Sequence, residues 1–489
     1  MNPASRFKIA IIGGGISGLT AALRAHELAQ QSGREVSITV FEASPRLGGV
    51  LRTERLGEYL VEHAADMWIT NKPEATRLCE KLGLADRLIP TDAKFRRSLV
   101  LRDGRAHPVP EGFQLMVPEQ AWPMLRSPLL SWRGKLRLLA EFFVRARHDG
   151  ADESLADFVR RRCGHEAFER LVQPLVGGIY TADPDKLSLK ATLPRFIEME
   201  RQHGSLIRAA LSQSRDRTRR ESPGTSGARY GLFVSLPDGI GELVSALAQR
   251  VAEVANIRCD ESVRGVRQNP NGSWALLPVS SIENTDGQEC PSSDFDAIIL
   301  AVPSFVAASL LAEGCPSLSN ELNRIEYAST VVVASGHKLA DIEHPLDAFG
   351  LVIPHIEHRK LLAVSFTSRK FPGRAPAGHV LLRTFFGGAL QPELCELNDS
   401  AILDLMHREL HELLGVRGEP DFVRVLRHTR AMPQYHVGHL DLVSRIQAES
   451  INHPGLALAG NYLTGVGIPD SIASGEAAAE SLLGSARVP

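Results

Sequence analysis

Residues 7–18 read Phe-Lys-Ile-Ala-Ile-Ile-Gly-Gly-Gly-Ile-Ser-Gly, an apolar run that leads directly into a glycine-rich turn. A short apolar, β-branched run predicts a parallel strand that is buried on both faces. Leu19 to Ala29, rich in alanine and leucine, predicts a helix after the turn, and Val36 to Phe41 predicts a second strand. The N-terminal region therefore predicts a strand–helix–strand unit, the building block of a Rossmann-type α/β fold.

The turn has the G-x-G-x-x-G spacing of a dinucleotide-binding site. Its first glycine permits the tight turn, the second lets the backbone approach a pyrophosphate, and the third lets helix and strand pack closely. Glu42 follows the second strand, 24 residues after Gly18, where a carboxylate accepts ribose hydroxyls. No arginine follows Glu42 directly, which disfavours a 2′-phosphate. The residues that we expect at the nucleotide are Gly13, Gly14, Gly15, Ile16, Ser17, Gly18, Glu42 and Ala43.

NAD and FAD both satisfy this pattern, and two further stretches favour FAD. In Arg46-Leu47-Gly48-Gly49, the glycines can bring a second backbone segment close to the cofactor, and Arg46 can neutralise phosphate charge. Residues 460–470 form a second glycine-rich turn before an alanine-rich helix that runs to Leu483. The N-terminus of that helix would stabilise negative charge on a reduced flavin ring.

Composition excludes several other classes of protein. The chain has 489 residues, with 55 Lys+Arg against 57 Asp+Glu, and this balance argues against a nucleic-acid-binding surface. Six scattered cysteines without a C-x-x-C pair fit a reducing compartment, so we expect a cytoplasmic protein. No metal-binding motif is found: His407 and His411 have helical spacing but lack a third ligand.

With these motifs the chain resembles the flavin-dependent protoporphyrinogen/coproporphyrinogen oxidase family, within the larger amine-oxidase-like flavoprotein group. The more specific markers are Gly178-Ile179-Tyr180-Thr181-Ala182-Asp183-Pro184 and Met432-Pro433-Gln434-Tyr435. The resemblance implies three interleaved domains. We expect an FAD-binding domain from residues 1–75, 232–305 and 425–489, a mixed-sheet substrate-binding domain from 76–110 and 306–424, and a helical domain from 111–231.

The resemblance also implies a wider set of residues around one non-covalent FAD. Beside the nucleotide turn, Arg46 and Gly49, the residues that it places at the cofactor are Ala64, Ala65, Asp66, Met67, Val263, Gly465, Val466, Gly467, Ile468 and Asp470. Two departures affect this transfer. The family usually has Gly-Pro where this chain has Ala64-Ala65. It also tends to have the sequence Tyr-Ala-Gly-Asp-Pro, in which this chain replaces the central Ala-Gly by Thr181-Ala182.

The implied substrate is a porphyrinogen, a non-aromatic tetrapyrrole that loses six electrons in three two-electron steps. No catalytic side chain is implied, because the flavin performs the chemistry and O2 reoxidises it to give H2O2. The site needs a flat apolar slot and cations for the propionates. The candidate substrate-binding residues are Gly178, Phe349, Val352 and Phe385 for the slot, and Arg97 and Lys72 for the propionates.

The sequence leaves the exact substrate open. The basic residues Lys94, Arg96, Arg97, Arg102 and Arg105 could serve coproporphyrinogen III, which has two carboxylates more than protoporphyrinogen IX, but a charge run is usually a solvated surface. An amine oxidase or carotenoid desaturase of the same fold is the alternative, with Tyr435 and Tyr462 as candidates for an aromatic cage around an amine. A flavin-binding protein without turnover is a third hypothesis.

Residues 125–144 mix tryptophan, phenylalanine and leucine with basic residues. A helix packed on the core is one interpretation, and an interfacial contact with the inner face of the cell membrane is the other. The resemblance also leaves open a homodimer and hand-over of the product to ferrochelatase.

Overall fold

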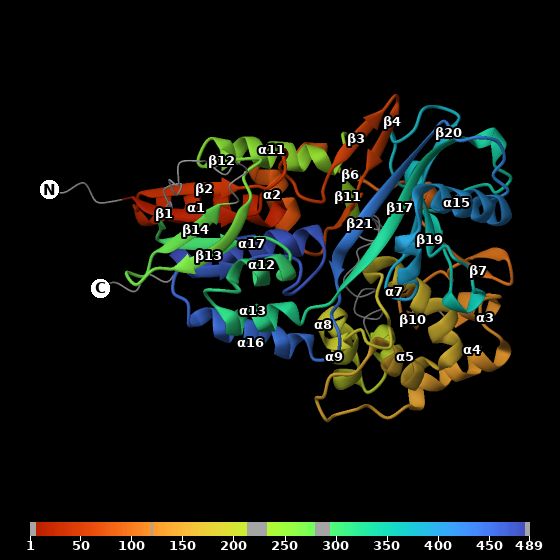
Figure 1. Cartoon of the computed structure of the whole chain (residues 1–489). Coiled ribbons are helices and arrows are strands. Elements are labelled where there is room, and N and C mark those ends of the chain that lie inside the picture. Colours follow the sequence, from red (N-terminus) through yellow and green to blue (C-terminus); the bar gives the residue numbers. More distant parts are fainter. Residues whose placement is uncertain (1–5, 119–120, 213–231, 279–293, 485–489) are drawn as a thin grey trace.

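The computed structural model describes residues 6–118, 121–212, 232–278 and 294–484. Two large sheets organise these residues, one of five strands and one of seven. Figure 1 shows the five-stranded sheet with its helices at one end of the molecule, and the seven-stranded sheet and a group of helices at the other. Segments near both chain ends contribute to the five-stranded sheet, as the split nucleotide-binding pattern requires.

The five-stranded sheet is parallel throughout, with the order β12-β2-β1-β16-β22. Its central strand β1 (Phe7–Ile12) is the apolar run that precedes the glycine turn. Its neighbours come from distant parts of the sequence: β2 (Val36–Phe41), β12 (Asn256–Arg258), β16 (Ala297–Leu300) and β22 (Leu456–Leu458). The predicted Rossmann-type α/β fold is confirmed.

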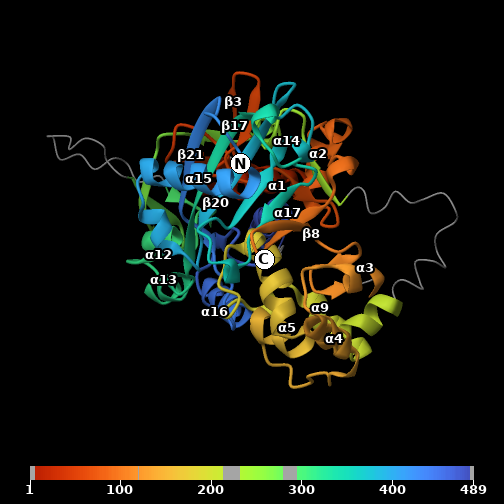
Figure 2. The same cartoon turned by 90° about the vertical axis from the view of Figure 1, so that its right-hand side faces the viewer.

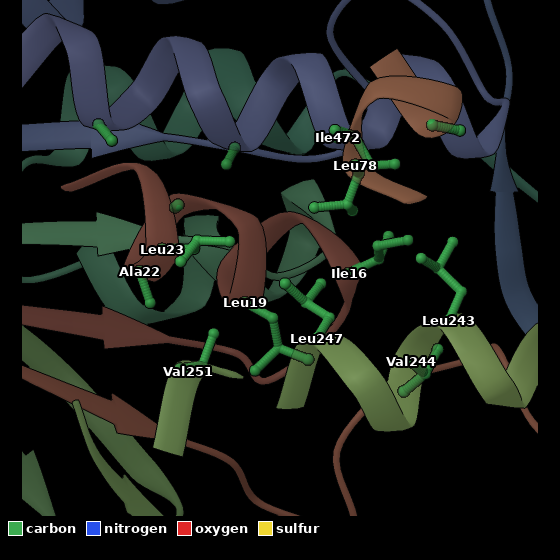
Figure 3. Packing of buried hydrophobic residues seen from close by; sticks show 14 of the residues in the cluster. Ile16, Leu19, Ala22, Leu23, Leu78, Leu243, Val244, Leu247, Val251 and Ile472 are labelled. Carbon is green, nitrogen blue, oxygen red and sulfur yellow. The ribbon is translucent and has the colours of Figure 1, made fainter. Parts of the chain in front are cut away.

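Four helices cover one face of this sheet: α1 (Ile16–Ser32), α2 (Glu74–Lys81), α11 (Ile240–Ala252) and α17 (Ile468–Leu483). Leu19 of α1, Leu247 of α11 and Ile472 of α17 are fully buried and point into one cluster (Figure 3). Burying one such side chain contributes about 1.5–3 kcal/mol, so this apolar layer holds the N-terminal and C-terminal segments together.

The other face of the five-stranded sheet packs against α12 (Ser304–Leu311), α13 (Pro316–Asn323), α16 (His439–Ile451) and a three-stranded antiparallel sheet. That small sheet contains β13 (Val263–Gln268), β14 (Trp274–Pro278) and β15 (Asp294–Phe295). The packing of α12 and α13 differs from the expected boundary at residue 305, because their leucines fill the core of the nucleotide-binding region.

The seven-stranded sheet is mixed, with the order β21-β17-β20-β19-β18-β7-β8. Its strands are β7 (Ser98–Arg102), β8 (Arg105–Pro108), β17 (Tyr327–Lys338), β18 (Gly350–Val352), β19 (Ala363–Phe366), β20 (His379–Gly387) and β21 (Phe422–Pro433). Only β18 and β7 pair in parallel, and α15 (Asp399–Leu414) packs on one face. The expected boundary at residue 425 falls inside β21, which pairs with β17 along its length.

A group of helices lies beneath the seven-stranded sheet in the view of Figure 2. Its helices include α3 (Ala121–Arg126), α4 (Trp132–Leu139), α5 (Leu155–Cys163), α7 (Gln173–Tyr180), α8 (Leu189–Thr192) and α9 (Pro194–His203). In the described residues, no helix combines the length and apolar character needed to span a membrane.

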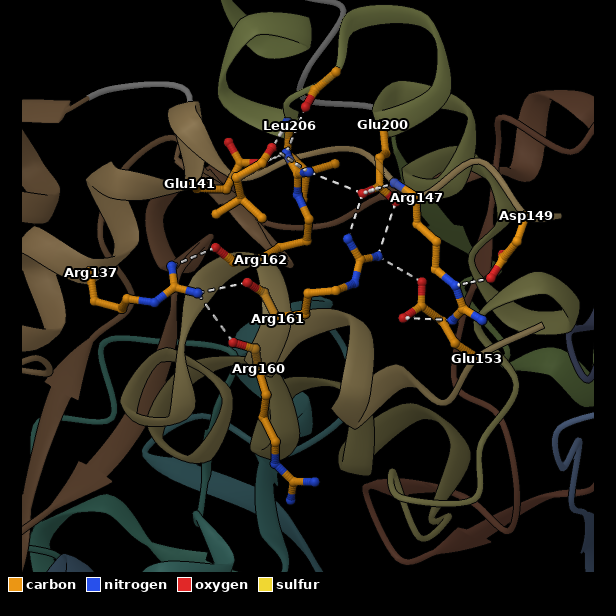
Figure 4. Close-up of polar contacts among 12 residues, drawn as sticks. Arg137, Glu141, Arg147, Asp149, Glu153, Arg160, Arg161, Arg162, Glu200 and Leu206 are labelled. Atoms are coloured by element: carbon orange, nitrogen blue, oxygen red, sulfur yellow. Dashed lines mark hydrogen bonds and ion pairs between the residues drawn. The ribbon is translucent and has the colours of Figure 1, made fainter. Parts of the chain in front are cut away.

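Inside this helical group, Arg162 is fully buried and forms ion pairs with two buried carboxylates (Figure 4). Its guanidinium contacts Glu141 and, at 3.0 Å, Glu200. Glu141 also accepts hydrogen bonds from Ser205 Oγ at 2.6 Å and from the backbone N–H of Leu206 at 2.8 Å. Because buried charges need partners, this network joins α5, α9 and the chain around residue 141.

Candidate active site

The glycine turn brings backbone rather than side chains to the carboxyl end of β1. Gly13 has a φ of +108°, and a Cβ there would lie 2.4 Å from the carbonyl oxygen of Ala301. A Cβ on Gly18 would lie 1.9 Å from the Gly13 carbonyl oxygen. Gly15 differs, since a Cβ there would meet no atom of the described residues within 4 Å, apart from its own neighbours in the chain. The space beside Gly15 is therefore open for a ligand, as the motif predicts.

The groups around this turn fit a dinucleotide. Helix α1 starts at Gly15 without a side-chain cap, and its first turn contains no acidic residue. The unsatisfied N–H groups of such a helix start suit a pyrophosphate. Glu42 accepts the backbone N–H of Gly14 at 2.7 Å on one carboxylate oxygen and that of Ser44 at 2.9 Å on the other. Each oxygen keeps a lone pair for a ribose hydroxyl.

The second glycine segment lies against the first. The backbone N–H of Gly48 donates to the Gly14 carbonyl at 2.8 Å, and a Cβ on Gly49 would lie 3.3 Å from Gly15 Cα. Arg46 holds this loop, because its guanidinium donates to the carbonyl oxygens of Leu47 at 3.1 Å and of Gly49. Burial and the charge of Arg52 lower the pKa of Arg46. Its observed contacts are thus within its own loop, and a contact with phosphate stays a prediction.

Helix α17 starts next to α1. Ser17, in the first turn of α1, donates its hydroxyl to the carbonyl of Ser471, in the first turn of α17, at 2.8 Å. A Cβ on Gly475 would lie 2.2 Å from the Ser17 carbonyl oxygen, so the two helices cross in close contact. Two helix N-termini therefore lie side by side at one end of the sheet, although 450 residues separate Ser17 from Gly467. A single extended cofactor can reach both.

The predicted flavin segment at residues 465–470 forms the start of α17. Gly467 is the N-cap residue, and its backbone N–H lies 3.3 Å from a carboxylate oxygen of Asp470. Lys72 pairs with the other oxygen of Asp470 at 2.5 Å. Ile468 is buried, and Val466 packs against the apolar cluster of the helical group. At the N-terminus of α17, the negative charge of Asp470 is therefore largely balanced by the positive charge of Lys72.

The stretch from Ala64 to Met67 lies between the two large sheets. Asp66 is buried, and Lys370 lies 3.1 Å from its carboxylate, with Arg383 at 3.9 Å. Burial opposes ionisation of Asp66, but the charges of Lys370 and Arg383 outweigh it and lower its pKa. Ala65 packs against the apolar core. These contacts fix the backbone path that the missing Gly-Pro left uncertain.

One face of the seven-stranded sheet is turned toward this stretch. Val352, Ala363 and Phe385 form a row across β18, β19 and β20. Arg383 shares their face because it precedes Phe385 by two residues, and its guanidinium donates to the Ala64 carbonyl at 2.6 Å. The half-buried row of apolar side chains is therefore beside the predicted flavin segment.

The remaining candidate residues lie in different parts of the fold. A Cβ on Gly178, in α7, would lie 3.9 Å from Val352 Cγ1, so the helical group closes on the same row. Phe349 precedes β18 and bonds through its backbone to Arg97. Val263 begins β13 and packs in the core on the far face of the five-stranded sheet. The structure thus joins Gly178, Val352 and Phe385, while the roles of all candidate residues stay predictions.

Sequence reasoning missed the charged group Asp66, Lys370 and Arg383, and the stacking of Tyr435 on His439. Lys370 and Arg383 lie more than 300 residues from Asp66, so no local pattern connects them. The one available signal was Arg383 itself, a charged residue inside an otherwise apolar strand. A charge in such a run is expected to have a partner.

The family model for flavin containing amine oxidoreductase matches residues 16–483 of the chain. This chain belongs to that family. The match runs from the first helix after the glycine turn to the last helix of the fold, and so includes both segments that meet at α1 and α17. The protein is therefore a flavin-dependent oxidoreductase with a flavin cofactor.

Within the family, the chain is 32% identical to coproporphyrinogen III oxidase of Bacillus subtilis (strain 168), over 97% of both chains. It is 31% identical to coproporphyrinogen III oxidase of Propionibacterium freudenreichii, over 99% of this chain and 92% of that protein. Protoporphyrinogen oxidase 2 of Arabidopsis thaliana is 28% identical, over 97% and 94%.

A crystal structure from Exiguobacterium sp. 255-15, described as a candidate protoporphyrinogen oxidase, superposes with a TM-score of 0.83 at 27% identity, covering 98% of this chain and 99% of that one. Cyclohexylamine oxidase of Brevibacterium oxydans superposes with a TM-score of 0.66 at 16% identity over 98% and 99%, which shows the shared fold.

Proposed function

We propose that the protein is an FAD-dependent porphyrinogen oxidase of haem biosynthesis, with coproporphyrinogen III favoured over protoporphyrinogen IX as substrate. The observation that carries this proposal is the similarity, over 97% of both chains, to a coproporphyrinogen III oxidase. A second enzyme of that name matches 99% of the chain. This similarity covers the seven-stranded sheet and the helical group as well, where we expect specificity for the substrate to be determined.

The geometry supports a flat, apolar substrate. Val352 and Phe385 lie in one row on the sheet face turned toward residues 64–67, and Gly178 approaches that row from the helical group. A tetrapyrrole macrocycle has an apolar face that such a row can bury, while its carboxylates remain at the edge. In this proposal the protein binds and orients the ring and excludes water from it.

FAD is the proposed form of the flavin, held without a covalent bond. The open space beside Gly15 would receive the pyrophosphate, Glu42 the ribose, and the start of α17 the ring end. A bound flavin supplies a two-electron acceptor that O2 can regenerate with release of H2O2. Three rounds remove the six electrons that separate a porphyrinogen from its porphyrin.

Anaerobic mixing tests the proposal directly. Coproporphyrinogen III added to the yellow holoprotein without oxygen is expected to bleach the flavin absorbance band, and admission of oxygen is expected to restore it with formation of coproporphyrin III. Protoporphyrinogen IX is compared at the same concentration, and the ratio of kcat/KM values decides between the substrates. A flavin that neither porphyrinogen reduces would overturn the proposal and leave the other flavoenzymes of this fold and a binding protein without turnover as the alternatives.

The alternative of an amine oxidase is disfavoured by two tyrosines. A cage for an amine needs aromatic faces open to the ligand. Tyr462 is fully buried and packs in the core behind the five-stranded sheet. Tyr435 is 1% exposed, stacks on His439 with ring centroids 4.0 Å apart, and donates its hydroxyl to the Asn461 carbonyl. Neither ring is free to receive an amine.

Peripheral membrane contact is part of the same proposal. Residues 125–144 fit both the core-packed and the membrane-contacting interpretation. Leu129, Leu130 and Leu138 are buried in the core, as the first interpretation expects. By contrast, Trp132 and Phe143 are 69% and 80% exposed. Exposed aromatic side chains beside basic residues suit the interface of an anionic bilayer. The protein would then be cytoplasmic and bind the inner face of the cell membrane, while a homodimer and hand-over to ferrochelatase stay predictions.

Vesicle sedimentation tests this contact. The native protein is expected to bind phosphatidylglycerol vesicles, and a Trp132→Ala/Phe143→Ala variant is expected to bind at least about tenfold more weakly, because it loses apolar area at the interface. Ile451→Ala is the matched control, since Ile451 is 80% exposed on α16, outside the helical group. Equal binding by the double variant and the control would refute the contact.

A further inference from the structure

The two cations expected to bind the substrate's propionates already have acidic partners. Arg97 forms an ion pair with Asp347 and donates to its backbone carbonyl at 2.7 Å. Lys72 forms an ion pair with Asp470 at 2.5 Å. A cation that is neutralised by a neighbouring acid attracts a carboxylate ligand less strongly than a free one, because the ligand must compete with that acid.

Arg195 is different. Across the described residues, from 6 to 484 with the gaps stated above, no carboxylate forms an ion pair with its guanidinium, and its observed contact is the ring of Phe196 at 4.6 Å. The residue is open to solvent, yet burial lowers its pKa. The residue is therefore accessible to an anionic ligand from solvent.

The position of Arg195 connects it with the candidate site through Tyr180. The Tyr180 hydroxyl lies 3.4 Å from the carbonyl of Thr192, which precedes α9. Burial raises the pKa of Tyr180 to about 12, with contributions of opposite sign from Asp470 and Arg195. The Tyr180–Thr192 contact joins α7 to the chain just before α9, and Arg195 follows Thr192 by three residues.

The surroundings of Tyr180 are the apolar part of the same site. Tyr180, Val352 and Val466 all pack against one apolar cluster. Val466 belongs to the predicted flavin segment, and Val352 to the apolar row of the sheet. A ring lying on that row would have Arg195 on the side of the helical group.

Helix stability gives no reason for this arginine. Pro194 and Arg195 begin α9, whose first turn contains no acidic residue. A cation near a helix N-terminus is unfavourable by typically about 0.3–1 kcal/mol. Arg195 thus receives no stabilisation from the helix dipole or from a described acid, and the exposed residue is available to an anionic ligand.

We propose that Arg195 is a carboxylate-binding residue of the substrate site, which anchors a propionate of the porphyrinogen at the edge formed by α7 and α9. The proposal rests on the proposed function, because it takes the ligand to be a tetrapyrrole carboxylate. Guanidinium and carboxylate form a bidentate, charge-assisted pair, and this pair would fix the rotation of the ring over the apolar row. Arg195 then acts in substrate binding and orientation.

Steady-state kinetics and ligand binding test the proposal on the intact holoprotein. For Arg195→Met we expect the KM for coproporphyrinogen III to rise about 10- to 100-fold, equivalent to about 1.4–2.8 kcal/mol, with kcat and flavin content close to native. Arg195→Lys keeps the charge and is expected to recover part of the loss. Arg201→Met is the matched control, since Arg201 lies on the same helix, is 69% exposed and pairs with Glu198.

A titration with coproporphyrin III, followed by quenching of its fluorescence, separates this proposal from the proposed function. The native protein is expected to bind coproporphyrin III more tightly than its tetramethyl ester, and Arg195→Met is expected to remove most of that difference. If the native protein shows this preference but oxidises no porphyrinogen, the proposed function fails and the carboxylate site stands. If Arg195→Met binds like native protein, or the native protein does not distinguish acid from ester, the carboxylate site is refuted.

Discussion

A Gly15→Val variant is expected to fold but to lose its yellow colour, with affinity for FAD reduced at least about 100-fold, or roughly 2.8 kcal/mol. Gly15 has a φ of −71° and a ψ of 178°, which a valine adopts without strain. Apart from its neighbours in the chain, no atom of the part of the protein that the structure describes lies within 4 Å of the position that its Cβ would take. The added side chain therefore occupies space beside the start of α1, where we expect the pyrophosphate.

The measurements are the flavin absorbance of purified protein and a titration of apoprotein with FAD, with circular dichroism to confirm the fold. Gly18→Val provides the contrast. Its Cβ would lie 1.9 Å from the Gly13 carbonyl oxygen, so this variant is expected to lose the fold as well as the cofactor. If Gly15→Val binds FAD with native affinity, the pyrophosphate does not lie beside Gly15.

An Arg162→Met variant is expected to lose about 3–5 kcal/mol of unfolding free energy, because it leaves the buried carboxylate of Glu141 without its counter-ion and removes one of the two arginines that pair with Glu200. Glu141 and Glu200 are 1% and 3% exposed, and Arg162 itself is fully buried. Arg162 also donates to the Gly204 carbonyl at 3.1 Å, so the end of α9 loses a contact too. Urea unfolding of native and variant holoprotein, followed by circular dichroism, measures the change.

Arg161→Met is the control for this effect. Arg161 precedes Arg162 on α5 and pairs with Glu153 and Glu200 at 2.7 Å each, but its side chain is 28% exposed. Glu200 keeps its ion pair with Arg162, and Glu153 keeps its ion pair with Arg147 at 3.6 Å, so we expect a loss of about 1 kcal/mol or less. Equal losses for the two variants would show that burial does not set the strength of this network.

The nucleotide-binding half of the fold could be predicted because its signals are local. A buried strand, a glycine turn and a helix occupy consecutive residues from Phe7 onward, and each follows from backbone sterics and apolar periodicity. The meeting of the two chain ends was also accessible, since both carry a glycine turn before a helix. The boundary at residue 425 was not accessible, because β21 joins the seven-stranded sheet by pairing with β17, about 95 residues earlier.

The substrate-binding residues could be predicted less well from the sequence, because the ion-pair partner of a charged residue depends on the tertiary fold. Arg97 and Asp347 are 250 residues apart, and Lys72 and Asp470 are 398 apart. A sequence shows each cation but not whether an acid faces it. Arg195, for which the described residues supply no acidic partner, lies at a helix start that no sequence motif marks. Its role could be inferred only from the positions of its neighbours.

The contact between Ser17 and Ser471 sets the order of events during synthesis. The two turns that frame the cofactor, at Gly15 and Gly467, are 452 residues apart, which a ribosome needs roughly 20–90 s to translate. Until α17 emerges, α1 lacks the helix that packs on it, and the nascent strand–helix–strand unit exposes apolar surface. The site at which the two helix starts meet is therefore complete only after the last helix of the described residues has been translated, so we expect the cofactor to bind after synthesis.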